Sequence, residues 1–430
     1  MKIKLYNIDF PYQTLIISII FILLTPFVNK WLILIPFFIQ IFRCLYYNEH
    51  IFMCDLAFLL PFSTIFMIPH WGTGIGTLII FENLVLLISK RAFKVNLSIK
   101  ILLFLITFIF LRTGNRYTDF IFIISSLLCV YLLLENITEY DSVRISYSFI
   151  YGVLISSIYG YIFRNSNQIL SYITDNTAVS REFMELFRFR GLCLDSNYYS
   201  VFLIMAIILC FILYIINKMN IIKFVSLITC FSFFGSQTYS RTFFVLLIIF
   251  TFLSFYFLLK NRKYFMSLIL FSIIVFFVIM TINGRIELFN VVLERLLKAK
   301  DVSQMTSGRT ELWMDYLINI KNHIGTLLIG NKLNAKLIGG LGPHNIYIEI
   351  LYTFGTVGFL LYFSYFSSLI KKVKMKYKYN YKENILAFFP VIIFLILYFT
   401  LQGIFISTTY IQLFIVISSM LLPLHIRKRD

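Results

Sequence analysis

Long apolar runs, separated by short polar stretches, recur from one end of the chain to the other. Each run is solidly apolar over about 17–25 residues, the length of helix that crosses a hydrocarbon core roughly 30 Å thick. A transmembrane barrel would show alternating apolar and polar residues, so these spans are expected to be helices. The pattern therefore predicts an all-α, polytopic integral membrane protein with about 12–14 transmembrane helices.

The candidate spans cover residues 12–28, 31–47, 51–69, 74–89, 99–112, 119–136, 144–163, 197–217, 221–237, 241–259, 264–282, 344–370, 385–404 and 406–424. Basic clusters follow several of them: "SKRAFKVNLSIK", "KNRK", "KKVKMKYKYNYK" and the final "RKR". With this set of spans all four clusters fall on one side, and the positive-inside rule makes that side the cytoplasm. Both termini are then expected in the cytoplasm, as in a multi-pass protein of a bacterial inner membrane.

Composition narrows the class of protein. Of 430 residues, 60% are hydrophobic and only 13% are charged, which leaves too little polar surface for a soluble domain of this length. A formal net charge of +18 is also found in nucleic-acid-binding proteins. Here the basic clusters between spans account for most of that charge, so no nucleic-acid partner is expected.

Span orientation divides the chain into three parts. Residues 1–163 form N-terminal transmembrane helices, and residues 371–430 form a basic cytoplasmic loop with C-terminal transmembrane helices. Between them, residues 164–370 form a core of the catalytic type, with outer loops at 164–196 and 283–343 between transmembrane helices. Those two loops hold most of the unexpected polarity in the chain.

The first outer loop ends in "RFRGLCLDSNYYS", which places Arg188 and Arg190 just before an apolar run, followed by Asp195 and Asn197. The arginines lie on the side that the positive-inside rule depletes, so orientation does not explain them. Guanidinium groups suit bidentate binding of phosphate or diphosphate. Asp195 has a second reading, as the N-cap of the following helix. Arg241, in "YSRTFF", either joins these arginines or simply extends to the lipid headgroups.

The second outer loop contains Arg309 and ends in "GGLGPHNIYIEILYTFGTVG", where glycines and a proline interrupt the chain just before His344. A helix N-terminus favours the neutral imidazole, which accepts a proton from a hydroxyl. The alternative is a histidine that only caps the helix. Asn345 and Glu349 lie one turn apart and continue the polarity into the span. Elsewhere on the outer side, Arg112 is expected mainly to anchor its span at the interface.

These segments together resemble the superfamily of O-antigen polymerases and O-antigen ligases, which are membrane glycosyltransferases of a GT-C-like kind. The resemblance covers about residues 180–365 and rests on the order and spacing of several short motifs. They are Arg188, Gly191, Asp195 and Asn197 in the first loop, where Ser196 replaces the usual proline; Arg241 in the serine–arginine element; Arg309 and Trp313; and His344, Asn345, Gly355 and Gly358.

The resemblance implies a donor glycan linked to polyprenyl diphosphate, such as undecaprenyl diphosphate, at the outer face of the membrane. It further implies an inverting, metal-independent transfer that needs no cofactor, with His344, Arg188 and Arg241 as catalytic residues. The implied substrate-binding residues are Arg190, Asp195, Asn197, Arg309, Asn345 and Glu349. His344 is expected to be the base, with Asp195 and Glu349 as rivals.

Three functions stay open on the sequence. A polymerase joins lipid-linked repeat units into a surface polysaccharide, either O-antigen of lipopolysaccharide or capsule, and works beside a flippase and a chain-length regulator. A ligase transfers the glycan to lipid A core or to a protein. A lipid-linked oligosaccharide flippase makes no covalent product. The polymerase is favoured, on the general likeness of the chain's composition to divergent polymerases.

Overall fold

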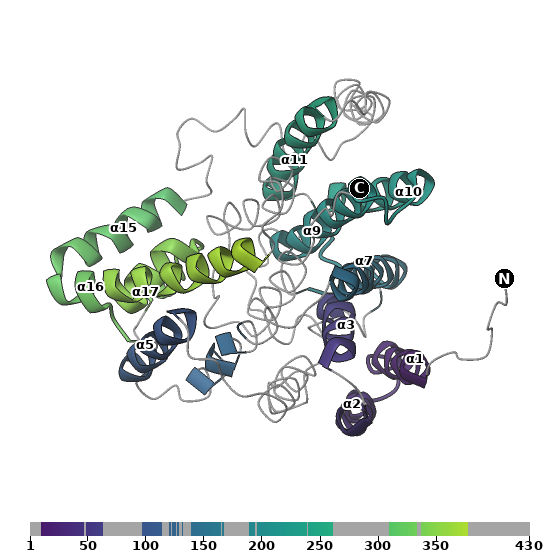
Figure 1. The fold of residues 1–430 in the computed structure, drawn as a ribbon, viewed down its shortest axis with the longest axis horizontal. Helices are drawn as coiled ribbons and strands as arrows, with labels where there is room; N and C mark the ends of the chain where they lie inside the picture. Colours follow the sequence, from purple (N-terminus) through teal and green to yellow (C-terminus); the bar gives the residue numbers. More distant parts are fainter. Residues whose placement is uncertain are drawn as a thin grey trace.

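The computed structural model describes residues 10–46, 49–62, 97–113, scattered positions from 120 to 131, 139–164, 166, 189–193, 196–238, 240–260, 309–332 and 337–376. Within these ranges every regular element is a helix (Figure 1). The all-helical class expected from the apolar runs is therefore confirmed.

The N-terminal half contributes α1 (Phe10–Leu24), the short helix η1 (Lys30–Ile33), α2 (Leu34–Tyr46), α3 (Glu49–Leu59), η2 (Leu60–Phe62), α5 (Leu97–Arg112) and α7 (Glu139–Ile162). The C-terminal half contributes α9 (Ser196–Ile215), α10 (Ile221–Ser236), α11 (Arg241–Lys260), α15 (Arg309–Asn322), α16 (Ile324–Ile329), η4 (Ile338–Gly340) and α17 (Ile346–Lys376).

Predicted spans that fall on described residues are helices whose ends agree with the sequence to within several residues. The ranges 74–89, 264–282, 385–404 and 406–424 lie outside the described residues, as does much of 119–136. By length and composition, Ser142–Ile162 and Ile346–Ser368 can each cross a membrane, and six shorter apolar helices accompany them in the described part. The full number of spans and their orientation stay predictions.

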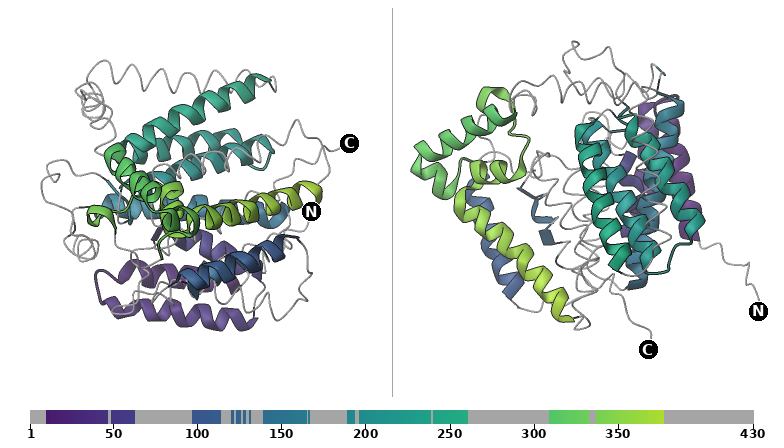
Figure 2. Two further views of the ribbon diagram at one scale, coloured as in Figure 1. Left: turned by 90° about the vertical axis from the view of Figure 1, so that its left-hand side faces the viewer. Right: turned by 90° about the horizontal axis from the view of Figure 1, so that it is seen from above.

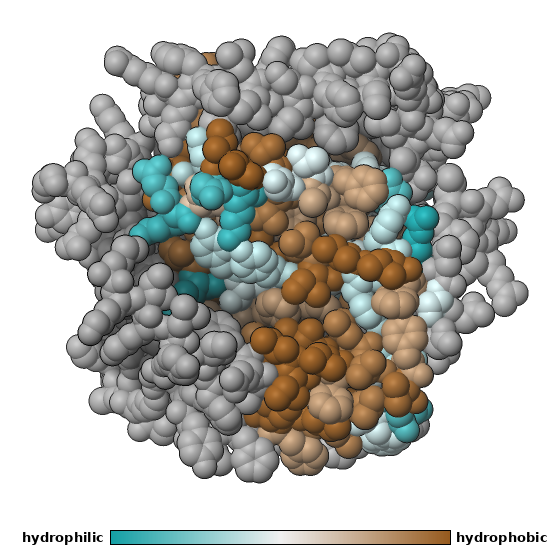
Figure 3. Space-filling model, turned by 90° about the vertical axis from the view of Figure 1, so that its right-hand side faces the viewer, coloured by the Kyte–Doolittle hydropathy of each residue, from teal (hydrophilic) through white to brown (hydrophobic). Residues whose placement is uncertain are grey.

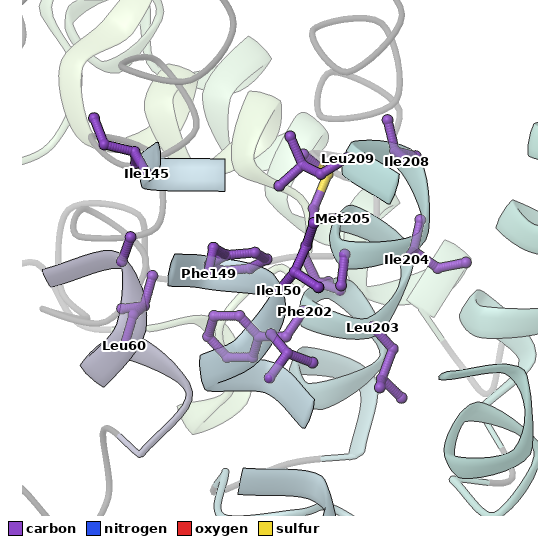
Figure 4. Close-up of a cluster of buried hydrophobic side chains, with 14 of the residues drawn as sticks. Leu60, Ile145, Phe149, Ile150, Phe202, Leu203, Ile204, Met205, Ile208 and Leu209 are labelled. Carbon is purple, nitrogen blue, oxygen red and sulfur yellow. The ribbon is translucent and has the colours of Figure 1, made fainter. Parts of the chain in front are cut away.

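The core forms where α9 packs between α7, α10 and α11. Residues Val201 to Leu213 of α9 are all buried, whichever side of the helix they occupy. Figure 4 shows part of this core, with Phe149 of α7 beside Phe202 of α9. Their ring centroids lie 6.1 Å apart. A helix that is apolar on every side and enclosed by other helices is typical of the centre of a membrane bundle.

Many large apolar side chains of the outer helices are exposed, among them Phe104 of α5, Ile222 of α10 and Phe252 of α11. Figure 3 shows a broad hydrophobic area on the face to the right in Figure 1. In water such a surface would be far larger than the patches on ordinary soluble monomers. It is the surface expected of helices that face lipid.

The right-hand view of Figure 2 separates the described helices into two groups. One group contains α5, α15, α16 and α17, and the other contains α7, α9, α10 and α11 with the N-terminal helices. In the first group α5 and α17 pack along each other, and α16 packs against α17.

One expectation needs correction: the predicted span 344–370 is not one continuous helix. The chain of α17 breaks at Gly355, where φ is 64° and ψ is −170°, and the second half continues to Lys376. Such a conformation is accessible to glycine but strained for other residues. The uninterrupted apolar sequence on both sides of Gly355 hides the break.

Candidate functional site

The first motif region is a tight turn, Phe189–Cys193, that leads into α9. Gly191 has φ of 55°, and a Cβ there would lie 2.5 Å from the ring of Tyr199. Leu192, Cys193 and Tyr199 are buried. The glycine thus lets the turn press against the first helical turn of α9, which explains why the resemblance includes a glycine at this position.

Aromatic side chains hold this turn against the ends of α7 and α10. The ring of Phe189 packs edge-on against Tyr199 at 5.3 Å and against Tyr161 at 5.9 Å between centroids. Its backbone N–H donates to the carbonyl of Gln237 at 2.9 Å. Half-buried Arg190 follows directly, so it extends from a rigid support.

Two motifs far apart in the sequence meet at the start of α9 and α11. The Ser240 hydroxyl donates to Oδ1 of Asn197 at 2.8 Å. One turn further along α9, the Ser200 hydroxyl lies 3.3 Å from the Thr238 hydroxyl. Arg241 is the first residue of α11, so its backbone is fixed beside Asn197. Arg188 and Asp195 lie outside the described residues, as does the side chain of Arg241.

His344 lies in a strained turn immediately before α17. Its φ is 48°, in the left-handed region that a histidine rarely adopts. Asn345 caps the helix, because its Oδ1 accepts the N–H of Tyr347 at 3.0 Å and of Ile348 at 3.3 Å. The capping role considered for His344 therefore belongs to Asn345.

α15 holds the loop that carries this histidine. The indole Nε1–H of Trp313 donates to the carbonyl of Pro343 at 2.7 Å, and the Tyr316 hydroxyl donates to the carbonyl of Leu341 at 2.7 Å. The same hydroxyl accepts the N–H of Ile338 at 3.2 Å. The loop is therefore fixed on both sides of Gly342, and the half-buried Arg309 begins the helix that fixes it.

A small apolar cluster lies under this loop. Tyr316 and Ile320 of α15 pack against Ile348 and Tyr352 of α17. Burial raises the pKa of the Tyr316 phenol, so the hydroxyl keeps its proton and continues to donate. Glu349, which is close enough to affect that phenol, is 6% exposed. Asn345 and Glu349 thus share one buried face, as their spacing predicted.

Next to this cluster, the end of α16 packs against α17 at the break of Gly355. A Cβ on Gly355 would lie 2.5 Å from the backbone nitrogens of Gly330 and Ile329. The N–H of Asn331 donates to the carbonyl of Tyr352 at 2.7 Å, which satisfies a group that the break removes from the helical pattern. Gly355 therefore allows close helix packing, and its partner is Gly330.

Arg112 takes part in this junction, which differs from the interfacial anchoring expected for it. Its guanidinium Nη2–H donates to the carbonyl of Gly330. α5 is thereby attached to the loop after α16. The sequence offered little signal for this role, because an arginine at the end of a span also fits simple anchoring.

The described residues therefore form two groups. The first joins Arg190, Asn197 and the start of α11, and the second joins the α15 helix of Arg309 to His344, Asn345 and Glu349. The resemblance implies that Arg188, Arg241 and His344 act together, so their convergence in one cleft is a prediction.

A family model described as O-Antigen ligase matches residues 225–363. The matched range begins in α10 and ends in α17, so it includes Arg241, Arg309 and His344. Neither the curated proteins nor the solved structures contain a match to the chain. Residues 225–363 are therefore similar to an O-antigen ligase domain, which supports the expected likeness to the superfamily of O-antigen ligases and polymerases, a membrane-embedded family that acts on lipid-linked glycans.

Proposed function

We propose that the protein is a polymerase that joins polyprenyl-diphosphate-linked repeat units into a surface polysaccharide on the outer face of the bacterial cytoplasmic membrane. The observation that carries the proposal is the hydrogen bond from Ser240 to Asn197. It holds together two arginine-bearing motifs that are more than forty residues apart in the chain. An arrangement of this kind suits one multiply charged anion better than two separate headgroup contacts.

Arg188, Arg190 and Arg241 bind the donor diphosphate in this proposal, with Arg309 contributing from α15. The start of α9 and the start of α11 add the positive ends of two helix dipoles. Negative charge grows on the diphosphate as the glycosidic bond breaks. Fixed cations therefore stabilise the transition state more than the ground state, without a metal ion.

His344 is the general base. It removes the proton from the acceptor sugar hydroxyl while that oxygen attacks the anomeric carbon. The bond from this carbon to the phosphate oxygen breaks, and polyprenyl diphosphate leaves with the electron pair. Direct displacement inverts the anomeric configuration. Asn345 and Trp313 position His344, since one caps the helix behind it and the other fixes the preceding carbonyl.

The first prediction concerns His344→Ala. Loss of the base should reduce chain elongation at least about 100-fold, the lower end of what a positioned acid–base group contributes. The measurement is product length on gels, with purified protein and lipid-linked repeat unit. His323→Ala is the matched control, because His323 is exposed in the same segment, between α15 and α16.

Near-normal polymer from His344→Ala would remove the catalytic role. The wild-type reaction separates the three functions at the same time. A ladder of products supports a polymerase, transfer of one unit to lipid A core or protein supports a ligase, and lipid movement without covalent product supports a flippase.

A further inference from the structure

The α15–α16 hairpin, residues 309–329, exposes an unusual number of apolar side chains for a segment between spans. Ile324 is 75% exposed, and Met314 is 56% exposed. The other exposed members of this apolar surface are Leu317, Ile318, Leu327, Leu328, Ile329, Leu337 and Leu341. So large an apolar surface on a polar loop indicates a partner that excludes water.

On α15 the apolar residues occupy one side of the exposed surface. Met314, Leu317 and Ile318 are spaced three and four residues apart, which places them on one flank of the helix. Lys321 shares that flank, whereas the exposed acids Glu311 and Asp315 form the neighbouring one. An apolar flank with a lysine beside it suits a lipid surface, because lysine extends its ammonium group to the phosphates.

This apolar surface continues into helices that face lipid. Arg112 at the end of α5 donates to Gly330, directly after α16. The Thr356 hydroxyl of α17 lies 3.5 Å from the carbonyl oxygen of Leu328. Beside these contacts, Leu111 of α5 and Val357 of α17 are exposed apolar residues.

The position of the hairpin in the fold agrees with lipid contact. In the right-hand view of Figure 2, α15 and α16 lie at the periphery, level with one end of the other helices rather than beyond it. A hairpin at that level, attached to α5 and α17, is within reach of the lipid that would surround the bundle.

We propose that α15 and α16 lie in the membrane interface, with their apolar flank immersed in the leaflet at the His344 end of the molecule. Lys321 and the exposed Lys332 face the lipid phosphates, and Glu311 and Asp315 face water. Trp313 and Tyr316 connect this hairpin to the loop of His344. The hairpin therefore sets the depth of His344 at the level of the phosphates, which, on the proposed function, is where a lipid-linked donor presents its diphosphate.

A photo-crosslinking experiment tests this contact. A benzophenone amino acid is introduced at Leu317 or Leu328 on the apolar flank, and at Asp315 as the matched exposed position on the acidic flank, nearly opposite Leu317 on α15. The full-length protein is reconstituted in phospholipid nanodiscs, irradiated without substrate and analysed by intact mass. Phospholipid adducts are expected at Leu317 and Leu328, at least about five times more abundant than at Asp315.

Equal adducts on both flanks, or none at Leu317 and Leu328, would overturn the proposal. Crosslinks between two copies of the chain at Leu328 would also overturn it, because the apolar flank would then be a protein interface. The readout needs no glycosyl transfer, so its failure is distinct from a failure of the proposed function.

Discussion

At the scale of single residues, two aromatic donors hold the loop of His344. A left-handed φ at a residue other than glycine costs free energy and persists only when its surroundings enforce it. The hydrogen bonds from Trp313 and Tyr316 to the carbonyls of Pro343 and Leu341 provide that enforcement. His344 is therefore held in place before any substrate arrives.

Tyr316→Phe tests this support. The substitution removes a donor to Leu341 and an acceptor for Ile338, so we expect a loss of about 1–2 kcal/mol of stability and a lower transfer rate with little change in KM. The measurements are the Tm in detergent and steady-state kinetics. Trp31→Phe is the control, because Trp31 lies in η1, far along the chain from this loop.

The contribution of Tyr316 to folding stability changes with pH in a definite direction. Because burial raises the pKa of Tyr316 above its usual 10.0, the folded state favours the neutral phenol. The neutral Tyr316 phenol therefore contributes its full share of folding stability below pH 10. This contribution decreases as the pH rises through the higher pKa that Tyr316 has in the folded state. The Tm difference between wild type and Tyr316→Phe should stay constant up to about pH 9.5. A difference that shrinks already between pH 6 and 8 would contradict this assignment.

At the scale of helices, the crossing of α16 and α17 depends on Gly330 and Gly355, whose main chains touch. Gly355→Ala brings a methyl group against backbone and forces a left-handed alanine. We expect the free energy of unfolding to fall by several kcal/mol. About 1–3 kcal/mol of this comes from overpacking and about 1–2 kcal/mol from the unfavourable backbone conformation. The loss of stability is measured by the yield of folded protein on size-exclusion chromatography and by the Tm.

Gly325→Ala is the matched control, because Gly325 lies within α16 and a Cβ there meets nothing within 4 Å. Wild-type yield and Tm are expected for it. If Gly355→Ala behaves like this control, the two helices do not cross as closely as the structure shows.

Helix positions were predictable because membrane helices need long apolar runs, and α9, α10 and α11 follow those runs closely. α15 was not predicted as a helix, because its polar sequence lacks the signal of a span and reads as loop. The break at Gly355 was hidden for the opposite reason, since apolar residues continue on both sides. Arg190, Asn197 and His344 were proposed as site residues from type and spacing. The contacts of Tyr316 with the loop before His344, and of Gly330 with Gly355, were not predictable because they join segments far apart in the sequence.

At the scale of the whole molecule, orientation relative to the membrane decides whether His344 meets an outer-leaflet donor. The basic end of α17 and the hairpin before it are expected on opposite sides. Alkaline phosphatase fused after Lys332 should be active, and the same enzyme fused after Lys376 should be inactive. Equal activity of the two fusions would contradict the proposed orientation.

The break at Gly355 also changes how α17 should be studied by mutagenesis. A helical wheel drawn across residues 346–376 assigns faces as if one axis ran through the whole segment, yet the two halves follow different axes. Glu349 and Leu360 share a sector on such a diagram, yet Glu349 is 6% exposed and Leu360 is 64% exposed. Scanning substitutions in this region should be interpreted as two separate helices, with the numbering of each wheel restarted at Thr356.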